Sequence, residues 1–186
     1  MIVKDIKDST KFSFQILSLL AAKSFLAFQR TNYERRRMAN VCDKIWYKID
    51  RKKLYVLLER YQARGLVERI KTNNLEEVRL TNKGRAYFLD QEFKNLKLKP
   101  KKKWDGRWRV VLFDVPEESK RTRDALRHTL KRLGFKEFQK SVFVFPFDCE
   151  NEINFVINYF DIPEHVYYMR SDISPDNKLR DHFKLN

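Results

Sequence analysis

The sequence has few cysteines and few glycines, and it has no long apolar run. Its two cysteines, Cys42 and Cys149, lie far apart, which excludes a disulfide framework and a CxxC metal knuckle. Four glycines leave no glycine-rich phosphate loop, so the Rossmann and P-loop fingerprints are absent. No apolar stretch approaches the roughly 18 residues of a membrane span, and the polar start MIVKDIKDST is not a secretory signal. We therefore expect a cytoplasmic protein with reduced thiols and no membrane partner.

The net charge of +15 is confined to one half of the chain. Met1–Lys103 holds 26 Lys and Arg against 11 Asp and Glu, whereas Trp104–Asn186 holds 14 of each. This asymmetry indicates that the first half meets a polyanion. The stretch 94–103, KNLKLKPKKK, is basic and has no apolar period, which is typical of a linker. The sequence thus predicts two domains, 1–93 and 104–186, joined by this basic linker.

Three helices, a β-hairpin and a further helix are predicted in the first half from apolar spacing and capping residues. They are a helix at Thr10–Phe28, a helix after the cap Asn32, a helix from the cap Asp50 to Gly65, strands at Leu66–Lys71 and Glu76–Leu80, and a helix from the cap Thr81 to Phe93. Three helices followed by a hairpin is the order of a winged helix-turn-helix. In such a domain the third helix is the recognition helix and the hairpin is the wing.

Basic side chains gather where a winged helix touches duplex DNA. The first turn of the third helix carries three cations at the end whose backbone N–H groups favour phosphate, and Lys52 and Tyr55 lie off the apolar face, toward base edges. For each single charge the alternative is a solvated helix face, but the agreement of helix order, hairpin and charge split favours DNA binding for the cluster. The candidate DNA-binding residues are Arg35, Arg36, Arg37, Arg51, Lys52, Lys53, Tyr55, Lys71 and Arg79.

Two short segments of the first half support the winged-helix prediction. The segments Tyr61–Glu68 (YQARGLVE) and Leu80–Arg85 (LTNKGR) resemble those of many winged-helix transcription regulators. The resemblance covers Leu54 to about Phe88. It implies that double-stranded DNA is the partner of this half.

The second half alternates apolar runs with helical patterns. Strands are expected at Val110–Phe113, Phe135–Gln139, Ser141–Phe147 and His165–Ser171. One helix is expected after the cap Ser119, with Leu126, Leu130 and Leu133 on one face, and another at Glu150–Phe160, capped by Asp148. The order is β-α-β-β-α-β, a ferredoxin-like arrangement, so the predicted fold class is α+β. The segment Ile173–Asn186 is compatible with a further strand or with disorder, and its composition does not decide.

The second half resembles a known family. The phrases Val111–Pro116 (VLFDVP), Gly134-Phe135 and Gln139–Phe143 (QKSVF) resemble the CRISPR-associated endonuclease family two over most of Trp104–Ser171. A winged helix joined by a linker to such a domain resembles the PaaX type of transcriptional repressor over nearly its whole length. The resemblance implies a homodimer, and an antiparallel edge near Val142–Val144 would extend the sheet across it.

Asp114, at the end of the first strand of this half, has two interpretations. The resemblance implies nuclease chemistry, in which two Asp114 carboxylates from two chains hold one Mg²⁺ that activates a water. The other interpretation is a turn residue before Pro116, bonded to a backbone N–H of the next helix or to a neighbouring Arg. We therefore expect a dimeric, sequence-specific repressor that requires no cofactor. The sequence does not identify an effector ligand. A metal-dependent endonuclease is the alternative, and an architectural DNA binder is the third hypothesis.

Overall fold

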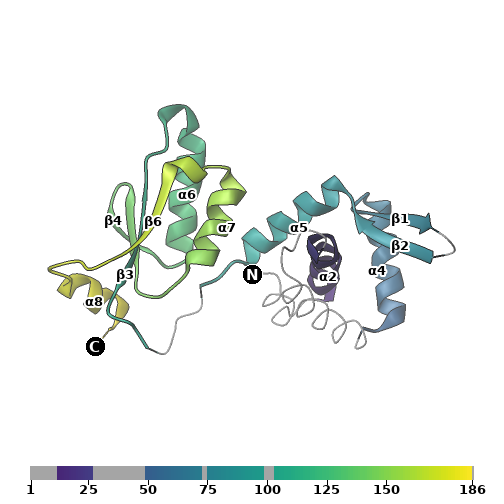
Figure 1. The fold of residues 1–186 in the computed structure, drawn as a ribbon, viewed down its shortest axis with the longest axis horizontal. Helices are drawn as coiled ribbons and strands as arrows, with labels where there is room; N and C mark the ends of the chain where they lie inside the picture. The colour runs from purple at the N-terminus through teal and green to yellow at the C-terminus, as the bar shows by residue number, and fades with distance from the viewer. Residues whose placement is uncertain (1–11, 27–48, 73–74, 99–102, 186) are drawn as a thin grey trace. The chain divides into compact units, whose positions relative to one another are not determined.

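The computed structural model describes most of the chain, namely residues 12–26, 49–72, 75–98 and 103–185. The chain divides into two compact units, Met1–Lys94 and Asn95–Asn186. Each unit contains its own antiparallel sheet, and helices accompany both sheets (Figure 1). The predicted α+β class is therefore confirmed. Within the described ranges, no helix is both long enough and apolar enough to cross a membrane.

The first unit places a two-stranded hairpin among helices. Its described elements are α2 (Phe12–Leu26), α4 (Arg51–Ala63), β1 (Val67–Thr72), β2 (Leu75–Leu80) and α5 (Asn82–Asn95). The hairpin strands pair antiparallel, from Val67 opposite Leu80 to Thr72 opposite Leu75. The helix predicted after Asn32 lies outside the described residues.

The helix α4 begins and ends where local chemistry predicts. The Asp50 carboxylate accepts hydrogen bonds from the backbone N–H groups of Lys52 at 3.0 Å and Lys53 at 3.2 Å, which confirms the predicted cap. Beyond its last turn, Gly65 adopts a φ of +67°, a left-handed conformation in which glycine has no steric cost. The side chains buried by this helix are Leu54, Leu57, Leu58 and Tyr61.

One apolar core holds the first unit together. It contains Ile16 and Leu17 from α2, and Leu66 and Leu80 from the open end of the hairpin, where the chain enters β1 and leaves β2. All four are nearly inaccessible to solvent. The Tyr61 hydroxyl donates a hydrogen bond to the Ser13 carbonyl at 3.0 Å, so it ties α4 to α2. Burial raises the pKa of Tyr61 to about 12, so this hydroxyl stays protonated and donating.

The second unit is a four-stranded sheet with helices on both faces. Its elements are β3 (Trp108–Phe113), the 3₁₀ turn Glu117–Ser119, α6 (Lys120–Arg132), β4 (Lys136–Gln139), β5 (Val142–Phe145), α7 (Glu150–Phe160), the 3₁₀ turn Pro163–His165, β6 (Val166–Ser171) and α8 (Asn177–Phe183). The strands run antiparallel in the order β4-β5-β3-β6. The helices α6 and α7 lie along one face, and α8 lies at the other (Figure 1).

The helix α8 covers part of the second sheet face. Leu179 and Phe183 pack with Trp108, Val110 and Val144, which lie on alternate positions of β3 and β5. The segment after Ile173 is thus a short helix in the structure, not the strand or disordered tail considered from sequence. Its burial of Leu179 explains why Val144 and Trp108 are inaccessible although they point away from α6 and α7.

The structure corrects details of three local expectations for the second unit. Ser119 is the N-cap residue of α6, as predicted, but its side chain makes no cap hydrogen bond, and a 3₁₀ turn precedes the helix. Cys149, not Asp148, is the N-cap of α7, and Asp148 pairs instead with Arg170 at 3.5 Å. The strand at Val142–Val144 is not an edge, because β5 lies between β4 and β3.

Candidate nucleic-acid interface

The solvent side of α4 forms the candidate interface. Because Leu54, Leu57, Leu58 and Tyr61 occupy the buried side, the residues at spacings of three and four on the opposite side face water. We call this set the outer face of α4, and it consists of Lys52, Tyr55, Val56 and Glu59. All four are exposed, and Tyr55 and Val56 have exposed fractions of 63% and 60%.

The first turn of α4 carries the predicted cluster of cations. Arg51, Lys52 and Lys53 are all exposed. The Lys53 ammonium lies 3.9 Å from the Asp50 carboxylate, a loose pair between two solvent-exposed groups. The N–H groups of Lys52 and Lys53 are occupied by Asp50, so they are not free to hold a phosphate as the sequence suggested. Any phosphate contact at this turn therefore falls to the side chains.

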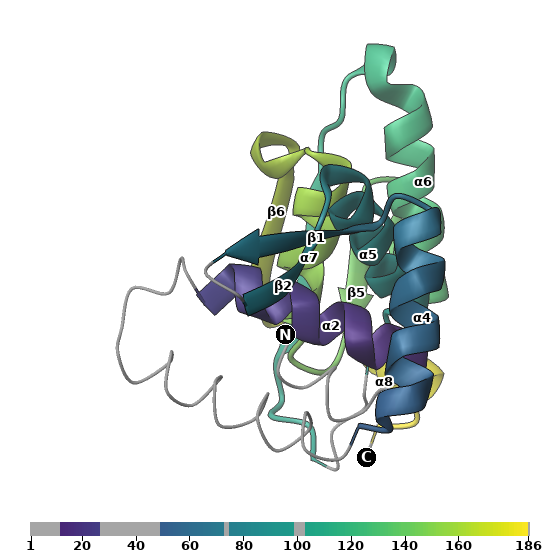
Figure 2. The same cartoon turned by 90° about the vertical axis from the view of Figure 1, so that its right-hand side faces the viewer.

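The hairpin lies beside α4 and is tied to it (Figures 1 and 2). An ion pair between Arg69 of β1 and Glu59 of α4 joins the two elements. Arg79 on β2 is half-exposed, and its guanidinium pairs with Glu77 at 2.7 Å along the same strand. This hydrogen bond to Glu77 raises the pKa of Arg79 above its ordinary value. The cation remains accessible on one side.

The other candidate residues are described only in part. Lys71 belongs to β1 and stands opposite Glu76 in the backbone register, while its side chain lies outside the described part of the structure. Arg35, Arg36 and Arg37 lie outside the described residues altogether. Sequence reasoning did not single out Val56. The signal for it was the same spacing that buries Leu54 and Leu57, since position 56 falls on the opposite side.

Asp114 is exposed at the end of β3. Its backbone N–H donates to the His165 carbonyl at 2.9 Å. Within the described ranges its carboxylate has neither the helix N–H nor the arginine partner of the turn-residue interpretation. The guanidinium of Arg123 pairs with Glu117 at 2.8 Å. The same ranges contain no group of three or more His, Cys, Asp or Glu able to hold a metal ion.

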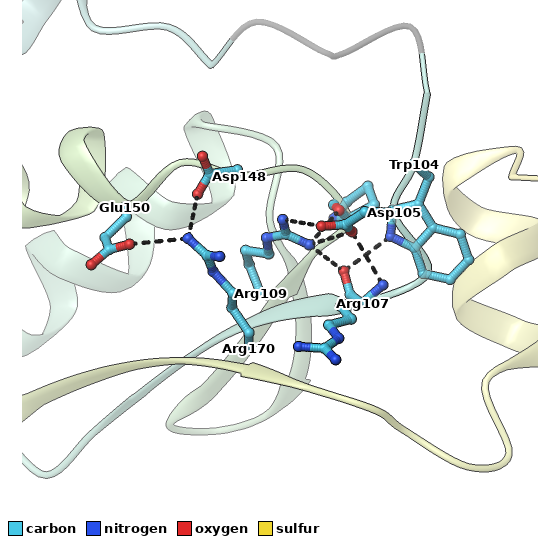
Figure 3. Close-up of polar contacts among 8 residues, drawn as sticks. Trp104, Asp105, Arg107, Arg109, Asp148, Glu150 and Arg170 are labelled. Atoms are coloured by element: carbon cyan, nitrogen blue, oxygen red, sulfur yellow. Dashed lines mark hydrogen bonds and ion pairs between the residues drawn. The ribbon is translucent and has the colours of Figure 1, made fainter.

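A polar network before β3 is structural. The Arg109 guanidinium, almost fully buried, donates two hydrogen bonds of 2.6 Å to the carboxylate of Asp105 and one of 2.6 Å to the Arg107 carbonyl (Figure 3). The hydrogen bonds from Arg109 hold the pKa of Asp105 well below its ordinary value. The Trp104 indole N–H donates to the same Arg107 carbonyl at 3.0 Å. The network holds the segment before β3 in place, and the buried Arg109 guanidinium is engaged with Asp105 and the Arg107 carbonyl.

The thiol of Cys149 is not a nucleophile. It is buried and free, and burial raises its pKa to about 12. A thiol in such surroundings stays protonated at neutral pH, and only the thiolate attacks or binds metals. The described part of the second unit thus presents Asp114 as its remaining candidate for chemistry.

One family of known proteins matches the second unit. Residues 101–182, from just before β3 to α8, match the family described as PaaX protein central Cas2-like domain. This match supports a relation to PaaX-type proteins. No curated protein matches the sequence. Among solved structures, the chain is similar to the uncharacterized protein Rv0674 from Mycobacterium tuberculosis at 20% identity and a TM-score of 0.35. The similarity covers 72% of this chain and 53% of that one, so the chain spans about half the length of that protein.

Proposed function

We propose that the protein is a cytoplasmic, dimeric, PaaX-type transcriptional repressor that binds duplex DNA through α4. One observation carries the proposal: the outer face of α4 is exposed and follows a first turn with three accessible cations. The unit around it is basic, since Met1–Lys94 holds 21 Lys and Arg against 11 Asp and Glu. A basic unit with an exposed helix beside a hairpin suits a duplex, whose phosphates attract the cations and whose major groove admits one helix.

The two units suit a winged helix and a ferredoxin-like domain. In the first, α2, α4, the hairpin and α5 follow in the order of a winged helix whose second helix would lie outside the described residues, with α4 as recognition helix and the hairpin as wing. In the second, β-α-β-β-α-β elements build a sheet of order β4-β5-β3-β6, which fits the ferredoxin-like arrangement.

The sheet face beside α8 supports dimerisation. Tyr167 and Met169 of β6 are 55% and 43% exposed, and the register places them beside Leu112 and Val110 on the face that α8 covers in part. Exposed apolar side chains gathered on one sheet face mark an interaction surface. Two copies packed through it would present two α4 helices. The operator would then be an inverted repeat with half-sites spaced by whole helical turns.

The test is a mobility shift of the full chain on duplex DNA from its own upstream region, in Mg²⁺ and then in EDTA. We expect a shift that needs no metal and leaves the DNA intact. The double variant Lys52→Ala/Lys53→Ala should bind DNA more weakly. The slope of log K against log salt concentration should become less steep by up to about 1.8, because two phosphate contacts are lost. A matched control removes two exposed lysines of the second unit, Lys120 and Lys178. Equal binding by both double variants would rule out α4 as the DNA-binding element.

A metal-dependent nuclease at Asp114 is the second candidate. The observation in its favour is the exposed carboxylate at the end of β3, which has no side-chain partner among the described residues. A single carboxylate is a weak site for Mg²⁺, which takes oxygen ligands and several waters. The candidate therefore requires a second copy of Asp114 across the dimer.

A further inference from the structure

Two apolar side chains on the outer face of α4 are mostly exposed to solvent. Tyr55 and Val56 have the largest exposed fractions of all large apolar side chains among the described residues, 63% and 60%. Val56 buries little surface, and a β-branched residue contributes less helix propensity than alanine or lysine would. Single exposed apolar residues are common. Here, however, two neighbours lie on the face that the proposed function directs at DNA.

Charge determines what this apolar site can meet. Arg51, Lys52 and Lys53 precede it by about one turn, and Arg60 follows Val56 by four residues. Glu59, the remaining member of the outer face, pairs with Arg69 of β1, which balances its charge. Cations on both sides of the apolar pair match the major groove, where phosphates line both rims and base edges form the floor. The thymine C5-methyl is the apolar group that this floor presents. A neutral protein surface would leave those cations unmatched.

We infer that Val56 reads a thymine methyl group in the major groove, with Tyr55 packed beside it. The inference rests on the proposed function, because it requires α4 to be the recognition helix. The cations position the helix on the backbone, whereas the apolar contact carries sequence information. Val56 is thus a specificity-determining residue, and the operator has a thymine at a fixed position in each half-site.

The probe is a duplex that the wild-type full chain selects from a random-sequence library. Each thymine is then replaced, one at a time, by deoxyuridine, which removes only the C5-methyl. At one position per half-site, the wild-type protein should lose about fourfold in affinity, the value of one methyl-sized apolar contact. In Val56→Ala the same replacement should cost nothing, because the contact is already gone. Val56→Ala should fold normally, since the site is exposed and alanine favours helix.

Leu89→Ala is the matched control, since Leu89 is another exposed apolar residue of the same unit, at 45%. It should keep the full deoxyuridine penalty. Selected DNA that binds equally well with every thymine replaced would overturn the inference and leave the proposed function standing. A penalty that persists in Val56→Ala would assign the methyl to another side chain. If Val56→Ala changed the oligomeric mass of the DNA-free protein in solution and left the deoxyuridine penalty unchanged, the outer face of α4 would be a protein–protein contact and not a base contact. Failure to select any duplex would remove the proposed function as well.

Discussion

Gly84 lies directly against the backbone carbonyl of Leu66. A Cβ at position 84 would stand 1.9 Å from that carbonyl oxygen, which no side chain can do without moving the backbone. Thr81 holds the contact in place: its hydroxyl donates to the Gly65 carbonyl at 2.7 Å and accepts from the Gly84 N–H at 3.0 Å. The segments Tyr61–Glu68 and Leu80–Arg85 therefore meet at the junction of α4, β1 and α5.

Gly84→Ala should destabilise the first unit. The added methyl must push the start of β1 away from α5, and overpacking of this kind costs about 1–3 kcal/mol. Urea unfolding followed by circular dichroism measures the change. Lys83→Ala, in the same turn but exposed, should stay within about 0.5 kcal/mol of wild type. Equal midpoints for the two variants would contradict the close contact.

Asp105→Asn should weaken the second unit in a pH-dependent way. Hydrogen bonds from Arg109 depress the folded-state pKa of Asp105. The stabilisation is therefore complete above the unfolded value near 4 and is lost as the pH falls through the folded value. At pH 7 the variant should lose about 1–3 kcal/mol, toward the lower end because half of the Asp105 side chain is exposed.

The measurement for Asp105→Asn is urea unfolding followed by tryptophan fluorescence, since Trp104 and Trp108 lie beside this network. The gap to wild type should shrink below about pH 4. Asp172→Asn, an exposed aspartate of the same unit, should show no such gap at pH 7. A gap that stayed constant from pH 7 to pH 3 would show that the ion pair is not its source.

Tyr167→Glu should convert the proposed dimer to a monomer. The substitution places a charge on the apolar sheet face, where a second copy would leave it buried without a partner. Light scattering after gel filtration gives the mass, and affinity for the selected duplex should fall because only one α4 is then presented. Tyr159→Glu, at an exposed site on α7, is the control. A wild-type protein that is already monomeric would remove the sheet face as a dimer interface.

Asp114→Asn separates the two candidate functions. If the protein is a repressor, the variant should bind DNA with unchanged affinity and salt dependence, because Asp114 lies outside the unit that we propose contacts DNA. The readouts are the mobility shift and inspection of the DNA for nicks after incubation with Mg²⁺. Mg²⁺-dependent cleavage by the wild-type protein that disappears in Asp114→Asn would instead establish the nuclease. EDTA should then abolish cleavage while leaving the shift.

Local chemistry determined most of the elements from the sequence alone. Apolar residues at spacings of three and four put Leu126 and Leu130 on the buried face of α6, where both are inaccessible. Asp50 and Gly65 set the two ends of α4. Both are predictable from sequence because each acts only on residues within one helical turn. The charge split between the halves likewise needed no structure.

Only the tertiary structure decided features that join distant segments. Asp148 is a reasonable cap by sequence, but β6 brings Arg170 to it, and the carboxylate pairs there instead. The strand β5 became internal because β3 and β4 flank it, which no apolar period reveals. The tail became a helix where Leu179 meets Trp108, since a short amphipathic segment takes its structure from the surface that buries it.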